Sequence, residues 1–333
     1  KQAASSLNIP VEIEMKSYLK MTEEALPKKF IDSIYQCEGV SLSYIFIREP
    51  IDFKFKNSSI DYAFHLAAQA LVITSYADPK ETFDTNVGGG INLLEAVRQT
   101  PSVRALVFIT SDKCYLNKEV ARGYVESDEL GGHDPYSASK AAAELVFASY
   151  ARSFFAQRPS FGAASARAGN VIGGGDWSAN RIIPDCVRAL VSKTPIEVRN
   201  PHATRPWQHV LEPLSGYVTL GSKLFLHGGG NAGSWNFGPP ETAVHTVKEV
   251  TEKAILEWGA GSLNITDSQS GPHEAVLLQL NCEKARAELG WQPRWDFSRT
   301  MHETIQWYRQ FADGINAFES SSAQLLAYET GTK

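Results

Sequence analysis

Tyr136 and Lys140 form a Tyr-x-x-x-Lys pattern near the start of an Ala-rich segment, residues 136–155, that predicts a long helix. Residues four apart lie on one face of a helix, one turn from each other. A lysine ammonium beside a phenol favours the phenolate and lowers the pKa of the tyrosine, so the phenol becomes a base for a hydroxyl proton near neutral pH. The same pattern also occurs by chance as an exposed pair on a helix.

A second group of reactive side chains, Thr110-Ser111-Asp112-Lys113, follows the apolar segment 104–110. In open α/β sheets, ligands bind beyond the carboxyl ends of the strands. A hydroxyl, a carboxyl and an amine in sequence there can orient, protonate and deprotonate a substrate. For these four residues alone, the alternative is a polar turn with Asp112 as a cap. A serine at a strand end, 25 residues before Tyr136, is the more specific pattern.

Strands and helices alternate over the first half of the chain, and they must position both groups. The segment 104–110 is apolar on both faces, as a buried parallel strand is. The segment 79–99 has apolar residues at helical spacing and is interrupted by three glycines. This alternation predicts an α/β fold with a parallel sheet that is covered on both faces. The expected strands are 11–15, 61–66, 104–110 and 164–171, and the expected helices are 79–99 and 136–155.

After residue 171, loops rich in Gly, Pro, Trp and Asn separate shorter elements. This pattern predicts a smaller mixed domain that closes over the sheet. Its expected helices are 183–192, 213–226, 247–258 and 299–311, and its expected strands are 196–199 and 276–280. From residue 314 the chain is polar and is expected to form a peripheral tail.

The composition of the 333 residues is that of a globular protein, with 43% hydrophobic and 21% charged residues. The formal net charge of −5 gives no support to a nucleic-acid partner. Four scattered cysteines favour reduced thiols over a disulfide framework or a metal site. No apolar run reaches the roughly 18 residues of a membrane span, and residues 1–10 do not resemble a signal peptide. We therefore expect a cytoplasmic protein with no metal and no membrane partner.

Ser111, Tyr136 and Lys140 resemble the catalytic set of the extended short-chain dehydrogenase/reductase superfamily. Within it, the chain is similar to the CDP-glucose 4,6-dehydratases from about residue 59 to about residue 308. The runs that carry this resemblance are His65–Gln69, Ile109–Tyr115, Asp134–Ser137, Arg167–Trp177, Asn200–His202, Arg205–Val210, Trp235–Pro239 and Leu289–Trp291. The Ser-Asp-Lys and Gly-Gly-Gly-Asp-Trp runs are specific to this subfamily.

The resemblance implies a Rossmann-like doubly wound parallel sheet with a smaller mixed α/β substrate domain. An NAD-binding domain would comprise residues 1–170 and about 205–235. A nucleotide-sugar-binding domain would comprise about 171–204 and 236–313, and a polar tail would comprise 314–333. The resemblance also implies a homodimer that forms through helices near 81–99 and 138–155.

The implied reaction converts a nucleotide-diphosphate hexose, with CDP-glucose favoured, into its 4-keto-6-deoxy form in three steps. Hydride passes from sugar C4 to NAD while Tyr136 accepts the O4 proton and Ser111 orients the hydroxyl. Asp112 then protonates the leaving C6 hydroxyl, and Lys113 removes the C5 proton. Hydride finally returns to C6, so no net oxidation results. Epimerases of this branch lack the acid–base pair, and Asp112-Lys113 therefore favours dehydration.

The resemblance assigns further residues to the ligands. The cofactor would contact Ala67, Ala68, Gln69, Asn86, Thr110, Tyr136 and Lys140. The substrate would contact Asn170, Arg181, Asn200, Arg205 and His209. Asn and His side chains near glycine-rich turns also often satisfy backbone groups. We interpret Gly173–Gly175 as a turn that allows close approach to the substrate, and Trp207, Trp235 and Trp291 as packing residues.

The chain departs from the family at its start. No glycine precedes Gly39, and we find neither the first strand, nor the glycine-rich turn that holds the NAD pyrophosphate, nor the acidic residue that grips the adenosine ribose. One explanation is that the sequence begins inside the first helix, with 11–15 as the second strand. The other is a degenerated cofactor site. Two alternatives to CDP-glucose dehydration therefore remain. One is a dehydratase or epimerase that acts on another nucleotide sugar, and the other is a non-catalytic homologue that binds nucleotide sugars.

Overall fold

The computed structural model describes residues 61–240, 243–266 and 278–331. The expected strand at 11–15 lies outside these residues. In the ranges described, no helix is both long enough and apolar enough to span a bilayer.

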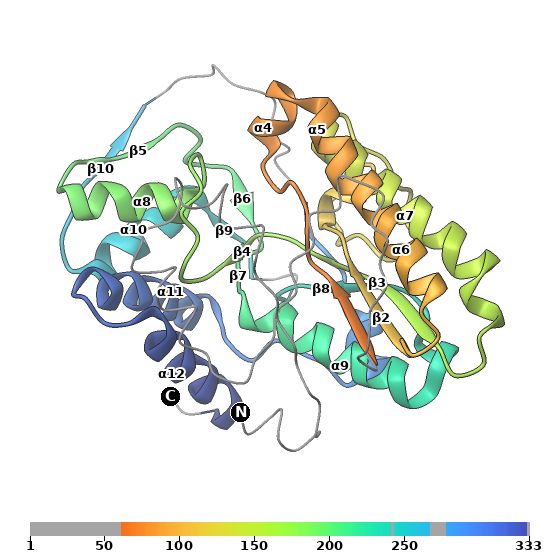
Figure 1. Ribbon diagram of the computed structural model, residues 1–333. Coiled ribbons are helices and arrows are strands. Elements are labelled where there is room, and N and C mark those ends of the chain that lie inside the picture. The colour runs from red at the N-terminus through yellow and green to blue at the C-terminus, as the bar shows by residue number, and fades with distance from the viewer. Residues whose placement is uncertain (1–60, 241–242, 267–277, 332–333) are drawn as a thin grey trace.

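The centre of the fold is a sheet of four parallel strands in the order β1-β2-β3-β8 (Figure 1). The strands are β1 (Tyr62–His65), β2 (Ala105–Ile109), β3 (Gly162–Ala168) and β8 (Gly233–Phe237). Helices α6 (Gly89–Gln99) and α7 (Pro135–Ser153) lie on one face and α9 (Leu211–His227) lies on the other. The predicted doubly wound parallel sheet is confirmed.

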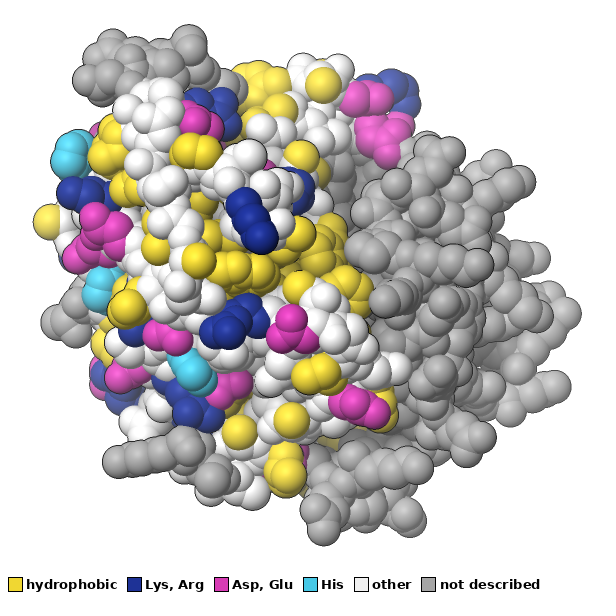
Figure 2. Space-filling model, turned by 90° about the vertical axis from the view of Figure 1, so that its left-hand side faces the viewer, with side chains coloured by type: hydrophobic (Ala, Val, Ile, Leu, Met, Phe, Trp, Pro, Cys, Tyr) yellow, Lys and Arg dark blue, Asp and Glu magenta, His cyan; other side chains and the backbone are white. Residues whose placement is uncertain are grey.

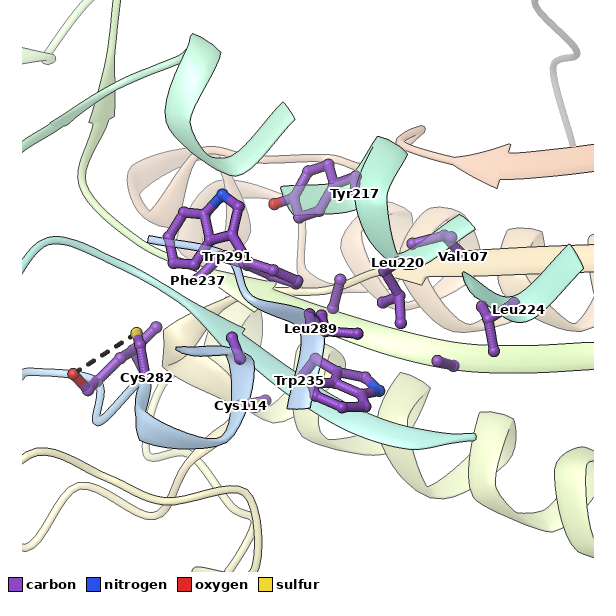
Figure 3. Close-up of a cluster of buried hydrophobic side chains, with 14 of the residues drawn as sticks. Val107, Cys114, Tyr217, Leu220, Leu224, Trp235, Phe237, Cys282, Leu289 and Trp291 are labelled. Carbon is purple, nitrogen blue, oxygen red and sulfur yellow. Dashed lines mark hydrogen bonds between the residues drawn. The ribbon is translucent and has the colours of Figure 1, made fainter. Parts of the chain in front are cut away.

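Strand β2 shows why both faces of the sheet are covered. Successive side chains of a strand point to opposite faces. Leu106 and Phe108 pack in the core under α6 and α7, and Val107 packs in the core under α9. Figure 3 shows Leu220 and Leu224 of α9 lying over the strands in this second core. A strand that is apolar at every position can only be buried by helices on both sides.

The expected helix over 79–99 is present in three pieces. A short helix α4 (Val72–Ala77), which we did not predict, precedes α5 (Pro79–Phe83). A π-helical turn, η1 (Asp84–Gly88), then joins α5 to α6. Such turns are frequent at functional sites, and this one contains Asn86, one of the predicted cofactor residues.

The remaining elements gather beside this sheet around a third hydrophobic core (Figure 1). The helices are α8 (Ile182–Ser192), α10 (Val247–Trp258), α11 (Phe297–Ala312) and α12 (Ala317–Thr330). Three two-stranded sheets pair β4 (Val171–Ile172) with β7 (Gln208–His209), β6 (Thr204–Arg205) with β9 (His245–Thr246), and β5 (Ile196–Val198) with β10 (Leu263–Ile265). On the face that Figure 2 presents, acidic and basic side chains are interspersed.

Three sequence expectations differ from the structure. The expected strand 164–171 is divided into β3 and β4, because Asn170 between them has a left-handed backbone, φ +53°. Of the expected strand 276–280, the described part holds only a bridge between Leu280 and Tyr124. The polar tail is wrong for residues 317–330. They form α12, whose Tyr328 is buried and donates a hydrogen bond to Glu212 (2.7 Å).

Candidate active site

The start of α7 fixes the predicted phenol and ammonium at the carboxyl edge of the sheet. Asp134 caps the helix by accepting the Ser137 N–H at 2.9 Å, and Pro135 occupies its first turn. One turn separates Tyr136 from Lys140, and both are buried. The Lys140 Nζ lies 5.8 Å from the centre of the Tyr136 ring. The sequence-predicted pair is therefore an internal pair and not an exposed one.

Burial controls the acidity of both groups. Removal from water raises the pKa of Tyr136 to about 12, and a hydrogen bond with Ser111 opposes this rise. The expectation that Lys140 lowers the pKa of Tyr136 is therefore wrong: the pKa is raised, and the cation that opposes this rise is Arg181. Burial lowers the pKa of Lys140 to about 8, with Cys114 and Glu144 acting in the opposite direction. Lys140 thus keeps its charge at neutral pH and loses it at mildly alkaline pH.

Ser111, Asp112 and Lys113 follow β2 at the same edge of the sheet. Ser111 caps the short 3-10 helix η2 (Asp112–Cys114) by accepting the Lys113 N–H at 3.2 Å. Its hydroxyl donates to Asp112 Oδ1 at 2.9 Å and also hydrogen-bonds Tyr136. The structure therefore brings Ser111, Asp112 and Tyr136 together, as expected from the sequence.

Asp112 has the surroundings of a carboxylic acid that holds its proton. It is only 4% exposed, and burial raises its pKa, while Lys113, Ser111 and Arg205 lower it. Lys113 is half-buried beside it. A neutral carboxyl next to a serine hydroxyl can donate a proton to a leaving hydroxyl group.

Gly169 makes room for Asp112, and the sequence interpretation missed this residue. A Cβ atom built on Gly169 would lie 1.9 Å from Asp112 Oδ2 and 2.1 Å from its Cγ. Real Cβ atoms do not approach other atoms so closely, so position 169 must be a glycine for the carboxyl to occupy this place. The signal in the sequence was a glycine directly after the strand that neighbours β2.

The predicted cofactor residues after β1 hold that loop against α7. The Gln69 N–H donates to Asn86 Oδ1 at 2.8 Å, and Asn86 Nδ2 donates to the Gln69 carbonyl at 3.0 Å and to Ser139 Oγ at 2.9 Å. Ala67 is exposed and Ala68 is half-buried in the same loop. Thr110 points inward and donates to Glu144 Oε1 at 2.5 Å. The loop therefore lies beside the Tyr136–Lys140 helix, with Asn86 as the link.

The predicted substrate residues fall into two groups. Arg205 is buried and close enough to Asp112 to lower its pKa. Asn170 follows Gly169, and Arg181 forms an ion pair with Asp176 at 2.9 Å and donates to the Ala70 carbonyl at 3.4 Å. These residues lie around the carboxyl edge of the sheet.

Asn200 and His209, the other two predicted substrate residues, differ in their surroundings. Asn200 is exposed after β5, and its predicted contact with the substrate stays a prediction. His209 is 1% exposed, packs on the Trp295 ring at 4.8 Å, and accepts the Leu211 N–H on Nδ1 at 3.3 Å. Burial lowers its pKa to about 3, so it is a neutral interior residue. Its Nε2 is buried and has no hydrogen-bond partner among the described residues, so a contact of His209 with the substrate stays a prediction.

In the turn Gly173–Gly175, a Cβ on Gly174 would lie 2.1 Å from the Trp307 ring, so glycine is needed there for the packing of Trp307. The close approach of this turn to the substrate stays a prediction. The three tryptophans 207, 235 and 291 are buried, as the packing interpretation requires. Within the described ranges, no cluster of His, Cys, Asp and Glu side chains could hold a metal ion.

Comparisons with known proteins give matches over most of the chain. The family model of the GDP-mannose 4,6 dehydratases matches residues 48–304. A CDP-glucose 4,6-dehydratase from Salmonella typhimurium is 42% identical, over 84% of this chain and 80% of that protein.

Two solved structures have the same fold. A dTDP-glucose 4,6-dehydratase from Streptomyces venezuelae, with NAD bound, has a TM-score of 0.71 at 22% identity, over 86% of this chain and 84% of that one. A UDP-glucose 4-epimerase from Thermus thermophilus, in complex with NAD, has a TM-score of 0.69 at 25% identity, over 82% of this chain and 86% of that one.

Proposed function

Since this chain belongs to the GDP-mannose 4,6 dehydratase family and is a homologue of CDP-glucose 4,6-dehydratase, we propose that it converts CDP-glucose into CDP-4-keto-6-deoxyglucose. The observation that carries the proposal is the buried Asp112 carboxyl, 2.9 Å from Ser111 Oγ and grouped with Tyr136. An oxidation alone needs a base and an orienting hydroxyl. An elimination also needs an acid, and Asp112 supplies one.

The described residues fit NAD at its nicotinamide end. A buried ammonium and a phenol at the carboxyl edge of a parallel sheet suit the hydroxyl groups of a ribose. We propose that Tyr136 and Lys140 hold this ribose and that the loop Ala67–Gln69, fixed by Asn86, lies against the cofactor. When bound, NAD accepts hydride from C4 and gives it back at C6. The place of the pyrophosphate turn falls outside the described residues.

The proton steps belong to the chain itself. Tyr136 accepts the O4 proton while the Lys140 ammonium, whose pKa is about 8, stabilises the phenolate at neutral pH. Ser111 orients the O4 hydroxyl through its hydrogen bond with Tyr136. Once C4 is a ketone, the C5 proton is acidic, and Lys113 removes it while Asp112 protonates the C6 hydroxyl as it leaves as water. Lys113 then gives its proton back to C5 when hydride is added at C6, so that the product is the substrate less one water. Arg205, Arg181 and Asn170 are proposed to bind the diphosphate end of the substrate.

The decisive experiment is incubation of the protein with CDP-glucose and NAD, with the product identified by mass as the substrate less one water. Formation of the 4-keto-6-deoxy product supports the proposal. Absence of product, while calorimetry shows that NAD is bound, overturns it. A panel of dTDP-, GDP- and UDP-hexoses in the same assay separates the related dehydratases and epimerases, and tight sugar-nucleotide binding without NAD binding identifies a non-catalytic homologue.

A cytoplasmic location and a homodimer complete the proposal. The location is supported by Cys114, Cys186 and Cys282, which are buried free thiols. The dimer is supported by exposed apolar side chains on the adjacent helices α5 and α7 and at the end of α7, where Phe83 is 38%, Leu145 61% and Phe154 44% exposed.

A further inference from the structure

A buried charge lies directly behind the proposed catalytic helix, and the proton steps do not use it. Glu144 is on α7, one turn beyond Lys140 and two turns beyond Tyr136, so all three share one face of the helix. Its side chain is 2% exposed. Burying a carboxylate costs free energy unless close cations and hydrogen-bond donors compensate for the lost water.

The partners of Glu144 come from the two strands whose ends carry the site. Oε1 accepts the Thr110 hydroxyl at 2.5 Å, and Thr110 directly precedes Ser111 after β2. Oε2 accepts the Ser165 hydroxyl at 2.8 Å and pairs with Arg167 Nη2 at 2.7 Å, both from β3. The carboxylate thus joins the helix of Tyr136 and Lys140 to the strand end of Ser111.

Arg167 extends this connection along the same face of the sheet, toward β8. Its side chain is 3% exposed and donates to the Tyr115 hydroxyl at 2.7 Å and to Ser234 Oγ at 2.9 Å. Tyr115 in turn donates to Asn236 Oδ1 at 2.8 Å. A buried ion pair of this kind adds little net stability compared with apolar packing. Its position behind the reacting groups therefore calls for another role.

We propose that Glu144 is a positioning residue: its carboxylate aligns the Tyr136–Lys140 helix with Ser111 and supplies the anion that keeps Lys140 charged. This inference rests on the proposed dehydratase function. Arg167 is the partner that makes a buried carboxylate at this position possible.

The electrostatic surroundings of Lys140 support this role. The titratable groups that face it are Tyr136 and Glu144 on its own helix, Cys114 in η2 and His65 at the end of β1. Burial raises the pKa of the Cys114 thiol and lowers that of His65 to about 4, so both are neutral near pH 7. Burial also raises the pKa of Tyr136, so the resting phenol is neutral and has to lose its proton before it can accept the one from O4. Of these four groups, Glu144 supplies the anion that opposes the loss of the Lys140 proton.

The test is the titration of the Lys140 ammonium, followed by heteronuclear NMR in the full chain, together with the pH profile of kcat. In Glu144→Gln we expect the Lys140 titration and the alkaline limb of kcat to move down by about one pH unit, because a neighbouring anion is lost. We also expect kcat at pH 7 to fall by roughly tenfold to a hundredfold, since the helix is no longer held in register. Glu144→Asp, which keeps the charge, should restore most of the titration.

Glu212→Gln is the matched control. Glu212 is also fully buried and accepts hydrogen bonds from the Arg294 N–H, the Trp295 N–H and the Tyr328 hydroxyl, but it belongs to α9. The Glu212→Gln variant should be less stable than the wild type, while its Lys140 titration should be unchanged. If Glu144→Gln does not fold, the double variant Glu144→Gln/Arg167→Met removes both charges and answers the same question.

An unchanged Lys140 titration in a folded variant without the Glu144 charge overturns the inference. The titration requires no turnover, so its result is distinct from that of the proposed function. A wild-type protein that fails to convert CDP-glucose, but whose Lys140 responds to Glu144, contradicts the reaction and leaves the positioning role intact.

Discussion

Gly169 and Asp112 are in contact at the ends of neighbouring strands. Because Gly169 has no side chain, the Asp112 carboxyl occupies the space that a Cβ at position 169 would fill. The distance from a Cβ on Gly169 to Asp112 Oδ2 would be 1.9 Å. Gly169 follows β3 and Asp112 follows β2, which pair in parallel from Ala105 and Gly162 onward. The contact ties the identity of residue 169 to the position of the proposed acid, Asp112.

Gly169→Ala should separate oxidation from elimination. The new methyl group displaces the Asp112 carboxyl, so the C6 hydroxyl loses its acid, while Tyr136 and Ser111 remain able to support oxidation at C4. We expect product formation to fall by about a hundredfold, as for a misplaced general acid, and NADH to accumulate. The measurement is NADH absorbance beside product mass. Gly229→Ala, where a Cβ would meet nothing within 4 Å, is the control. Full product formation by Gly169→Ala would contradict the acid role of Asp112 in its present place.

Asp112→Asn should also let NADH accumulate without product, and it should stabilise the fold. Burial raises the pKa of Asp112, so the folded protein binds a proton more tightly than the unfolded chain does. The cost of burying this group is therefore absent at pH values below its unfolded pKa and grows as the pH rises above it. The variant should melt at a higher temperature than the wild type at pH 7, and the difference should shrink toward pH 4. A variant that melts lower at pH 7 would show that the carboxylate is stabilised in the fold.

The rate should fall above about pH 8 because Lys140 loses its charge there. The sign follows from the lowered pKa: the folded protein releases this proton at a pH where the unfolded chain still binds it. Between the two pKa values, stability therefore rises with pH while activity falls. Lys140→Arg stays cationic and should remove this alkaline limb from the pH profile of kcat, with a lower maximum rate. A limb that persists unchanged in Lys140→Arg would assign it to another group.

Helix α12 should contribute to stability, in contrast to the peripheral tail expected from the sequence. The Tyr328 hydroxyl donates to Glu212 at 2.7 Å and lies 3.0 Å from Ser215 Oγ. Tyr328→Phe should lower the free energy of unfolding by about 1 to 2 kcal/mol, the value of a buried hydrogen bond to a carboxyl group. Urea denaturation measures the change. As a control, Tyr76→Phe should leave the free energy of unfolding unchanged, because Tyr76 is 50% exposed.

Association should depend on the outer face of α7. Leu145 is 61% exposed there, and a charge at this position would oppose a helix–helix interface. In sedimentation velocity we expect a dimer for the wild type and a monomer for Leu145→Glu. Leu256→Glu, at a residue that is 68% exposed on α10, should remain a dimer. The same sedimentation coefficient for both variants would place the interface elsewhere.

The sequence predicted what is set locally and by periodicity. Strand β2 is apolar at every position and is buried on both faces, and the spacing of Tyr136 and Lys140 places them one turn apart on a helix, as expected. The predicted helix 247–258 matches α10 residue for residue.

Relationships between distant segments were not predicted. The Gly169–Asp112 contact depends on which strands are neighbours. His209 lies in a mixed polar and apolar part of the sequence, and its ring packs against Trp295, 86 residues away. The docking of α12 depends in the same way on a distant residue, because its Tyr328 hydroxyl donates to the buried carboxyl of Glu212. Residue types predicted the kind of chemistry, but they did not predict how the residues pack around each group.

The ion pair of Glu144 with Arg167 has a consequence for how the protein matures. Its outer donors and acceptors come from β8, whose residues 233–237 follow Lys140 by more than 90 positions. Before β8 has been synthesised, the chain can already form the helix of Tyr136 and Lys140, but the guanidinium of Arg167 still lacks its partner from β8. The set of contacts around Arg167 is therefore complete only once β8 has joined the sheet.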